Sequence, residues 1–105
     1  MILVTTESIP GKKTIKTIGL VRGNTIRARH LGHDVMAFLK NVVGGEIIDY
    51  TKMMAEAREQ ALDRLGEDAA AAGANAVVGL RITTTMMMQS AAEFLAYGTA
   101  VVVEE

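Results

Sequence analysis

Two histidines, His30 and His33, lie three residues apart, and Asp34 follows them directly. Imidazoles at this spacing on a helix can face the same way, and a neighbouring carboxylate can help to complete a Zn, Ni or Cu site. A zinc site needs roughly three or four placed ligands, so this pair supplies only half of one. The alternative is that these residues form the polar N-terminus of a helix and that both histidines are solvated. The sequence favours this alternative. His30 and His33 are the metal-ligand candidates, and a divalent metal ion is the cofactor that they imply.

Methionines form a second group, with a run at positions 86–88 and a pair at Met53 and Met54. Thioethers are soft ligands that suit Cu(I). Consecutive residues of a strand point to opposite faces, however, so the run cannot easily share one metal ion. Methionine more often fills gaps in cores and interfaces, and we interpret these residues in that way.

A third group places polar side chains on or beside the apolar face of a long predicted helix: Tyr50, Arg58, Arg64 and Asp68. They could form a polar pocket between subunits, in which Arg58 binds a carboxylate or another anion bidentately. They could equally form an ion-pair network between subunits, because charged side chains on an otherwise apolar face occur both in structural ion-pair networks and in functional sites. We favour the network.

An enzyme built on this group would use Tyr50, Arg58 and a carboxylate such as Asp49 as acid and base groups. No nucleophile, base and orienting residue occur together, because cysteine is absent and Ser8 and Ser90 have no local partner. The glycine clusters also lack the phosphate-loop spacing. We therefore predict no catalytic residues and a protein that is not an enzyme.

Composition narrows the remaining classes. A chain of 105 residues predicts a single domain over residues 1–105, and half of its residues are hydrophobic. The net charge of -1 argues against a nucleic-acid partner, which needs a basic surface. No apolar run approaches the roughly 18 residues of a membrane helix, and the first residues lack the features of a secretory signal. We expect a cytoplasmic protein.

The elements that must position these residues follow from hydrophobic periodicity and glycine stops. Strands are predicted over residues 2–6, 14–28, 76–87 and 94–103, with a hairpin loop over 88–93. Helices are predicted over residues 31–43 and from an N-cap at Asp49 to a stop at Gly73.

The strand patterns indicate which faces are covered. Val78, Leu80 and Ile82 alternate on one face of their strand, and we expect this face to meet the helices. The last strand is apolar on both faces, which predicts burial on both sides. One chain has helices enough for one face only, so the other face is expected to meet a neighbouring subunit. The sequence thus predicts an α+β subunit that oligomerises.

A set of residues that runs through most of the chain carries a family resemblance: Gly44-Gly45, Tyr50, Ala57-Arg58, Ala61, Leu65-Gly66, Gly73-Ala74-Asn75-Ala76-Val77-Val78-Gly79 and Gly98-Thr99-Ala100-Val101. The set resembles the YbjQ-like family, an uncharacterised family that also carries a heavy-metal-binding label. The resemblance implies a dodecin-like βαββ subunit, with an antiparallel sheet covered on one face by helices, in a ring of five subunits. The chain departs from the family pattern in lacking cysteine and in having Glu46 where an arginine often follows the two glycines.

These observations lead to one expected function and one alternative. We expect a ring-forming protein that acts as a non-catalytic scaffold or as a small-ligand-binding module. The alternative is binding of a Zn-, Ni- or Cu-type ion through the two histidines. The expected partners are further copies of the same chain, as a homopentamer, and a small ligand or metal ion, with no nucleic acid and no membrane.

Overall fold

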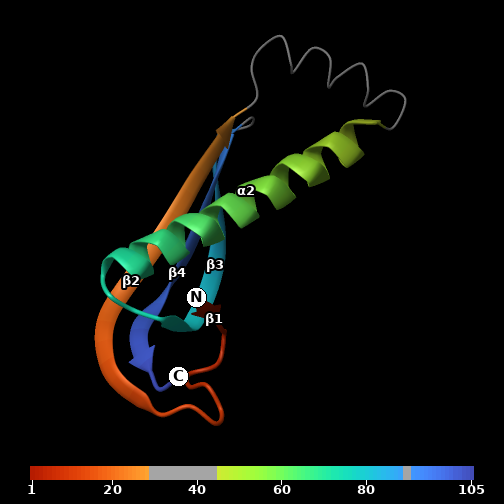
Figure 1. The fold of residues 1–105 in the computed structure, drawn as a ribbon. Helices are drawn as coiled ribbons and strands as arrows, with labels where there is room; N and C mark the ends of the chain where they lie inside the picture. Colours follow the sequence, from red (N-terminus) through yellow and green to blue (C-terminus); the bar gives the residue numbers. More distant parts are fainter. Residues whose placement is uncertain (29–44, 89–90) are drawn as a thin grey trace.

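The computed structural model describes residues 1–28, 45–88 and 91–105, with the backbone alone for residues 28, 45–50 and 88. In these ranges four strands and one helix follow in chain order (Figure 1): β1 (Ile2–Leu3), β2 (Thr14–Ala28), α2 (Gly45–Ala71), β3 (Ala76–Met88) and β4 (Ala91–Val103). The predicted α+β class is confirmed. The helix predicted over residues 31–43 falls outside the described residues.

The sheet is mixed, with the strand order β1-β3-β4-β2. The strand β4 lies between β3 and β2 and runs antiparallel to both, whereas β1 runs parallel to β3. The prediction of a purely antiparallel sheet is therefore wrong for the β1–β3 pair. A parallel pair needs a long crossover connection, and the chain between β1 and β3, which includes β2 and α2, supplies it.

The hairpin between β3 and β4 is tighter than the predicted loop over residues 88–93. Met88 pairs with Ala91, so β3 ends later and β4 begins earlier than their hydrophobic runs suggest. Glu93 pairs with Thr85 on one side and with Ile26 on the other. A central strand is held by two ladders of hydrogen bonds, which fix even a stretch of small and charged residues that has little strand propensity of its own.

The helix α2 ends as predicted and begins earlier than predicted. Gly73 has a φ of 90°, its amide donates to the Ala70 carbonyl, and the Ala74 amide donates to the Ala69 carbonyl, both at 3.0 Å. This is the Schellman arrangement, in which glycine takes the left-handed position. The first helical residue is Gly45, so Asp49 lies inside the helix and is not its N-cap. No glycine or proline separates Gly45 from Asp49, so nothing stops the helix from starting there.

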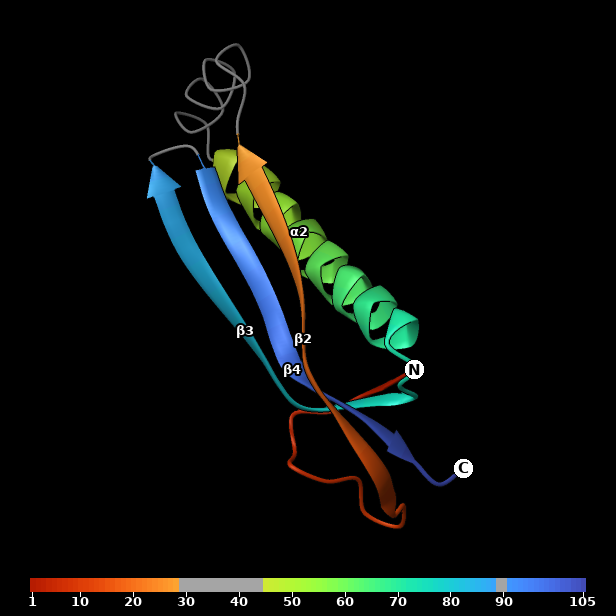
Figure 2. The same ribbon diagram turned by 90° about the vertical axis from the view of Figure 1, so that its left-hand side faces the viewer.

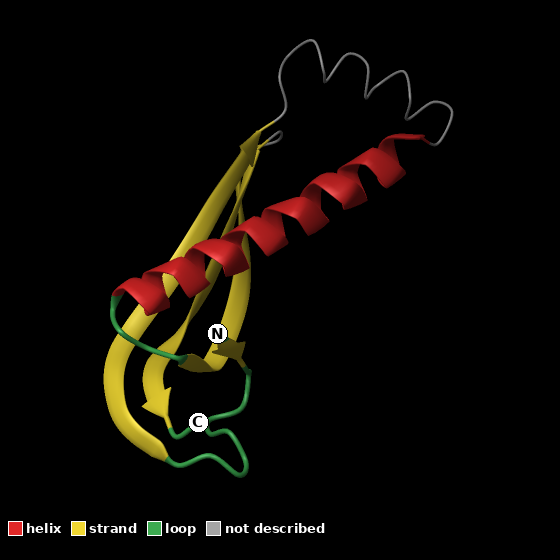
Figure 3. Ribbon diagram, in the orientation of Figure 1, coloured by secondary structure: helices red, strands yellow, loops and turns green. Residues whose placement is uncertain are grey.

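The helix α2 lies across one face of the sheet (Figure 3). A stripe of mostly small residues, spaced four apart on α2, is fully buried: Ala57, Ala61, Leu65 and Ala69. The helix backbone lies very near β2 at Gly23. A Cβ atom at this position would overlap the Leu65 amide nitrogen and the Ala61 carbonyl oxygen. The small residues on α2 therefore serve the contact with the chain's own sheet.

A bulge in β3 changes which of its side chains face α2. Gly79 has a φ of 62°, and the register with β4 shifts between Val78 and Arg81. Leu80 packs in the core under α2 together with Val77, whereas Val78 belongs to the cluster on the opposite face. The prediction was right for Leu80 and wrong for Val78, because the extra residue of a bulge shifts the alternation of the side chains.

The face of the sheet opposite α2 is covered only in part, as Figure 2 shows. At one end, Ile2, Val4 and Ile9 pack on the buried side chains of Val78 and Val101. Farther along the strands no described element lies on this face. We call the uncovered part the open face, and its large apolar residues are Leu20, Ile26, Leu95 and Tyr97.

The approach at Gly23 yields a stability prediction. We expect Gly23→Ala to lower the free energy of unfolding by about 1–3 kcal/mol, because the helix backbone must move away from β2. Gly66→Ala is the matched control, because a Cβ there meets nothing within 4 Å. Because alanine favours the helix more than glycine does, Gly66→Ala should raise the free energy of unfolding by up to about 1 kcal/mol. Denaturant unfolding at one fixed protein concentration measures both, and equal effects of the two variants would contradict this packing.

Candidate functional site

The residues predicted to form sites do not gather in one place. His30 and His33 lie outside the described residues, and Tyr50 lies in α2 with its side chain undescribed. Arg58 is exposed on α2. Among the side chains that the structure describes, no three His, Cys, Asp or Glu residues come close enough to hold a metal ion.

Arg64 and Asp68 contact the outer edge of β2. The Asp68 carboxylate accepts a hydrogen bond of 3.1 Å from the Arg22 amide, and an Arg64 guanidinium nitrogen donates one of 2.6 Å to the Asn24 carbonyl. One helical turn earlier, Arg27 donates to the Gln60 side chain at 3.0 Å. Arg64 and Asp68 thus satisfy backbone groups that an edge strand leaves open, whereas Gln60 binds a side chain of the strand.

This arrangement explains why charges occur beside the apolar face of α2. Arg64 and Asp68 are four residues apart, as are Ala61 and Leu65 in the neighbouring buried stripe. The buried stripe lies over the sheet, and the polar stripe lies along the edge of β2. The site proposed at Tyr50, Arg58, Arg64 and Asp68 remains a prediction, because the side chain of Tyr50 is not described.

Of the methionines singled out in the sequence, Met54 has the predicted packing role, and Met86 and Met87 do not have it in the single chain. Met54 is half-buried and packs against the core under α2, whereas Met86 and Met87 are exposed near the end of β3. Met86 pairs with Ala92, and the register shifts between Met86 and Met88.

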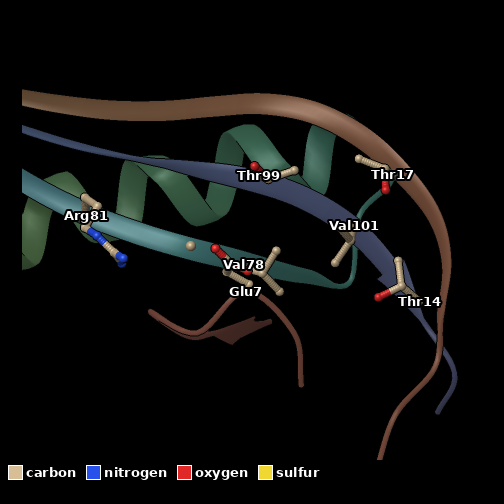
Figure 4. Close-up of a pocket in the computed structure, with 8 residues that line it drawn as sticks. Glu7, Thr14, Thr17, Val78, Arg81, Thr99 and Val101 are labelled. Atoms are coloured by element: carbon tan, nitrogen blue, oxygen red, sulfur yellow. The ribbon is translucent and has the colours of Figure 1, made fainter. Parts of the chain in front are cut away.

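A pocket of about 470 Å³ opens on the sheet face opposite α2, at the end where the N-terminal segment crosses (Figure 4). Its floor is formed by Val78, Gly79 and Val101. The polar side chains around it come from the N-terminal segment and from three strands: Glu7, Thr14, Thr17, Arg81 and Thr99. In Figure 4, Arg81 lies at one end, Thr14 and Thr17 lie at the other, and Glu7 and Thr99 lie between them.

Backbone hydrogen bonds hold the N-terminal segment in place as one wall of this pocket. The Gly79 amide donates to the Thr6 carbonyl at 2.7 Å, and the Leu80 amide donates to the Val4 carbonyl at 3.0 Å. Arg81 adds side-chain bonds from one guanidinium nitrogen to the Thr5 carbonyl, at 2.9 Å, and to the Leu80 carbonyl, at 2.8 Å.

The sequence analysis did not identify the residues of this pocket. Thr14, Thr17 and Thr99 are ordinary strand residues, and Glu7 lies in a predicted turn. The available signal was Gly79, a glycine inside a predicted strand, which often marks a bulge or a close backbone approach. It could indicate a local irregularity, but not that the N-terminal segment would cross there.

In the described part of the chain, no helix is both long and apolar enough to cross a membrane.

Comparison with known proteins places the chain among similar sequences. Residues 1–104 match a family model described as "Putative heavy-metal-binding". A UPF0145 protein of Clostridioides difficile is 56% identical over 105 residues, which cover 100% of this chain and 94% of the relative. A UPF0145 protein of Dehalococcoides mccartyi is 55% identical over 104 residues, which cover 99% and 100% of the two chains. One from Pyrococcus horikoshii is also 55% identical over 104 residues, which cover 99% and 89%.

A solved structure has the same fold. It is the crystal structure of a protein of unknown function from Pediococcus pentosaceus that belongs to the DUF74 family. The two structures superpose with a TM-score of 0.69 over 99% of this chain and 98% of the other, at 16% sequence identity. At this identity the likeness concerns the fold alone.

The edge contacts of α2 yield a second prediction. We expect Asp68→Ala to lower the free energy of unfolding by about 1 kcal/mol relative to Asp63→Ala, because only Asp68 binds a backbone amide of β2. Both residues are exposed on α2, so helix propensity changes equally in the two variants. The Asp68 variant should also aggregate faster on heating, because it exposes the strand edge. Equal unfolding and equal aggregation would contradict the role assigned to Asp68.

Proposed function

This chain belongs to the YbjQ-like family of UPF0145 proteins, and from that premise we propose that it is a non-catalytic subunit of a closed ring that binds a small ligand. The proposal rests chiefly on one observation. The face of the sheet opposite α2 carries large apolar side chains that nothing described covers: Leu20, 72% exposed, Ile26, 54% exposed, and Tyr97, 37% exposed.

Burying this open face against a neighbour would be favourable by about 25 cal/mol for each Å² of apolar surface removed from water. On this face the apolar side chains are interspersed with Arg22, Asn24 and Glu93. Exposed apolar groups bordered by polar residues commonly mark contact surfaces. The neighbour proposed is a second copy of the chain, in keeping with the pattern of a final strand that is apolar on both faces.

The strand edges favour a closed assembly over an open one. In the described chain, β1 is short and flanks only the beginning of β3, so the later part of β3 borders no strand but β4. The outer edge of β2 is occupied by α2 at Arg22 and Asn24. When a head-to-tail contact closes into a ring, both contact surfaces of every subunit are buried against a neighbour. The number five is what the family resemblance implies.

The ligand-binding part of the proposal rests on the pocket beside Val78 and Val101. It combines a small apolar floor with polar and charged side chains, which suits a small polar ligand rather than an apolar one. No catalytic group is assigned to it, because its described side chains include no histidine or cysteine and no second carboxylate beside Glu7.

Light scattering behind size-exclusion chromatography tests the ring. We predict that the wild-type protein elutes as a particle of about five times the chain mass of 11.2 kDa. Leu20→Lys should dissociate it, because a charge would then have to be buried in the contact. Ala70→Lys places the same charge on the exposed side of α2 and should leave the particle intact. A wild-type monomer at micromolar concentration would remove the basis of the ring.

Metal binding is the second candidate, and the description of the family favours it. We predict for this candidate that calorimetric titration of Zn, Ni or Cu(II) detects binding to the wild type and none to the His30→Ala/His33→Ala variant. Neutral imidazole is the ligand, so affinity should fall as the pH drops through about 6.5. Absence of binding to the wild type, or equal binding to the variant, would end this candidate.

A further inference from the structure

The pocket between the N-terminal segment and the sheet is lined by one positive side chain, Arg81, and one negative side chain, Glu7, which do not form an ion pair with each other. We propose that it binds a small zwitterion of the amino-acid type, with the ligand carboxylate on Arg81 and the ligand ammonium on Glu7. This inference rests on the ligand-binding part of the proposed function and names the class of ligand.

The two charges come from separate elements. Arg81 belongs to β3, and Glu7 belongs to the segment that crosses over it. The side chain of Glu7 makes no hydrogen bond and no ion pair with any described residue, so its carboxylate is available to a ligand. A purely anionic ligand would be repelled by Glu7, and a purely cationic one would be repelled by Arg81. A ligand that carries both charges meets neither penalty.

Arg81 is held in place before any ligand arrives. One of its terminal nitrogens donates to the Thr5 and Leu80 carbonyls, at 2.9 and 2.8 Å. The remaining N–H groups of Arg81 bond to no other described residue and can donate to a carboxylate. A fixed guanidinium loses little conformational freedom on binding, and its hydrogen bonds to a carboxylate are among the stronger ones in proteins.

The rest of the lining suits a compact ligand with a short apolar part. Val78 and Val101 form a buried apolar floor. The hydroxyls of Thr14, Thr17 and Thr99 have no described partner and can bond to polar atoms of the ligand. The volume of about 470 Å³ lies in the range of small-molecule sites and leaves room for ordered water around an amino acid.

The test is a titration calorimetry panel on the full-length protein, whose oligomeric state is measured in the same samples. The panel contains the standard amino acids, carboxylates that lack the amine, amines that lack the carboxylate, and neutral polyols. We expect at least one amino acid to bind with a Kd below about 1 mM, and analogues that lack either charge to bind at least about tenfold more weakly.

Three variants locate the binding. Glu7→Gln keeps the shape and removes the charge, so it should weaken amino-acid binding at least about tenfold. Carboxylates that lack the amine should bind this variant at least as tightly as the wild type, because their repulsion by Glu7 is lost. Thr99→Val should weaken binding through the loss of one hydroxyl. Glu56→Gln removes the same charge on the exposed side of α2 and should have no effect.

The outcomes separate this inference from the proposed function. Equal amino-acid binding in the wild type and Glu7→Gln, or tighter binding of a singly charged or neutral compound, would overturn the ligand class and leave ligand binding standing. No binding of any compound would overturn the ligand-binding proposal as well. The light-scattering result decides the ring independently of both.

Discussion

The close approach of α2 to β2 at Gly23 determines where the other surfaces of this molecule lie. The helix backbone reaches the strand only because Gly23 has no side chain and because the helix presents Ala57, Ala61 and Ala69 beside a single large residue, Leu65. Van der Waals contacts at such short range are individually weak, but many of them act together in a close-packed layer. Once this layer is formed, the orientation of α2 over the sheet is fixed.

That orientation has two consequences for the rest of the sheet. It places the polar stripe of Gln60, Arg64 and Asp68 along the outer edge of β2, where these side chains bind strand residues. It also places the only described helix on one face, so the opposite face depends on other segments for cover. The N-terminal segment covers one end of that face and, with the bulge at Gly79, creates a pocket there.

The sequence indicated those features that depend on local chemistry. The C-terminal stop of α2 at Gly73 and the strand over residues 14–28 follow from glycine conformation and hydrophobic periodicity, and both are confirmed. The facing of Val78 could not be derived from alternation, because the bulge at Gly79 is stabilised by a bond to Thr6, more than 70 residues earlier in the chain. The pocket was missed for the same reason, because its groups come together only after the N-terminal segment has crossed the sheet.

The pocket and the open face are neighbours, and this bears on how ligand binding and assembly would influence each other. Thr99, which lines the pocket, pairs directly with Leu20, the most exposed large apolar residue among the side chains that the structure describes. A subunit that covers Leu20 therefore lies beside the pocket and changes the solvation of the groups around it. Charged hydrogen bonds strengthen when water is excluded from their surroundings. If assembly strengthens ligand binding by some factor, thermodynamic linkage requires the ligand to strengthen assembly by the same factor, so the two proposed activities would form one coupled equilibrium.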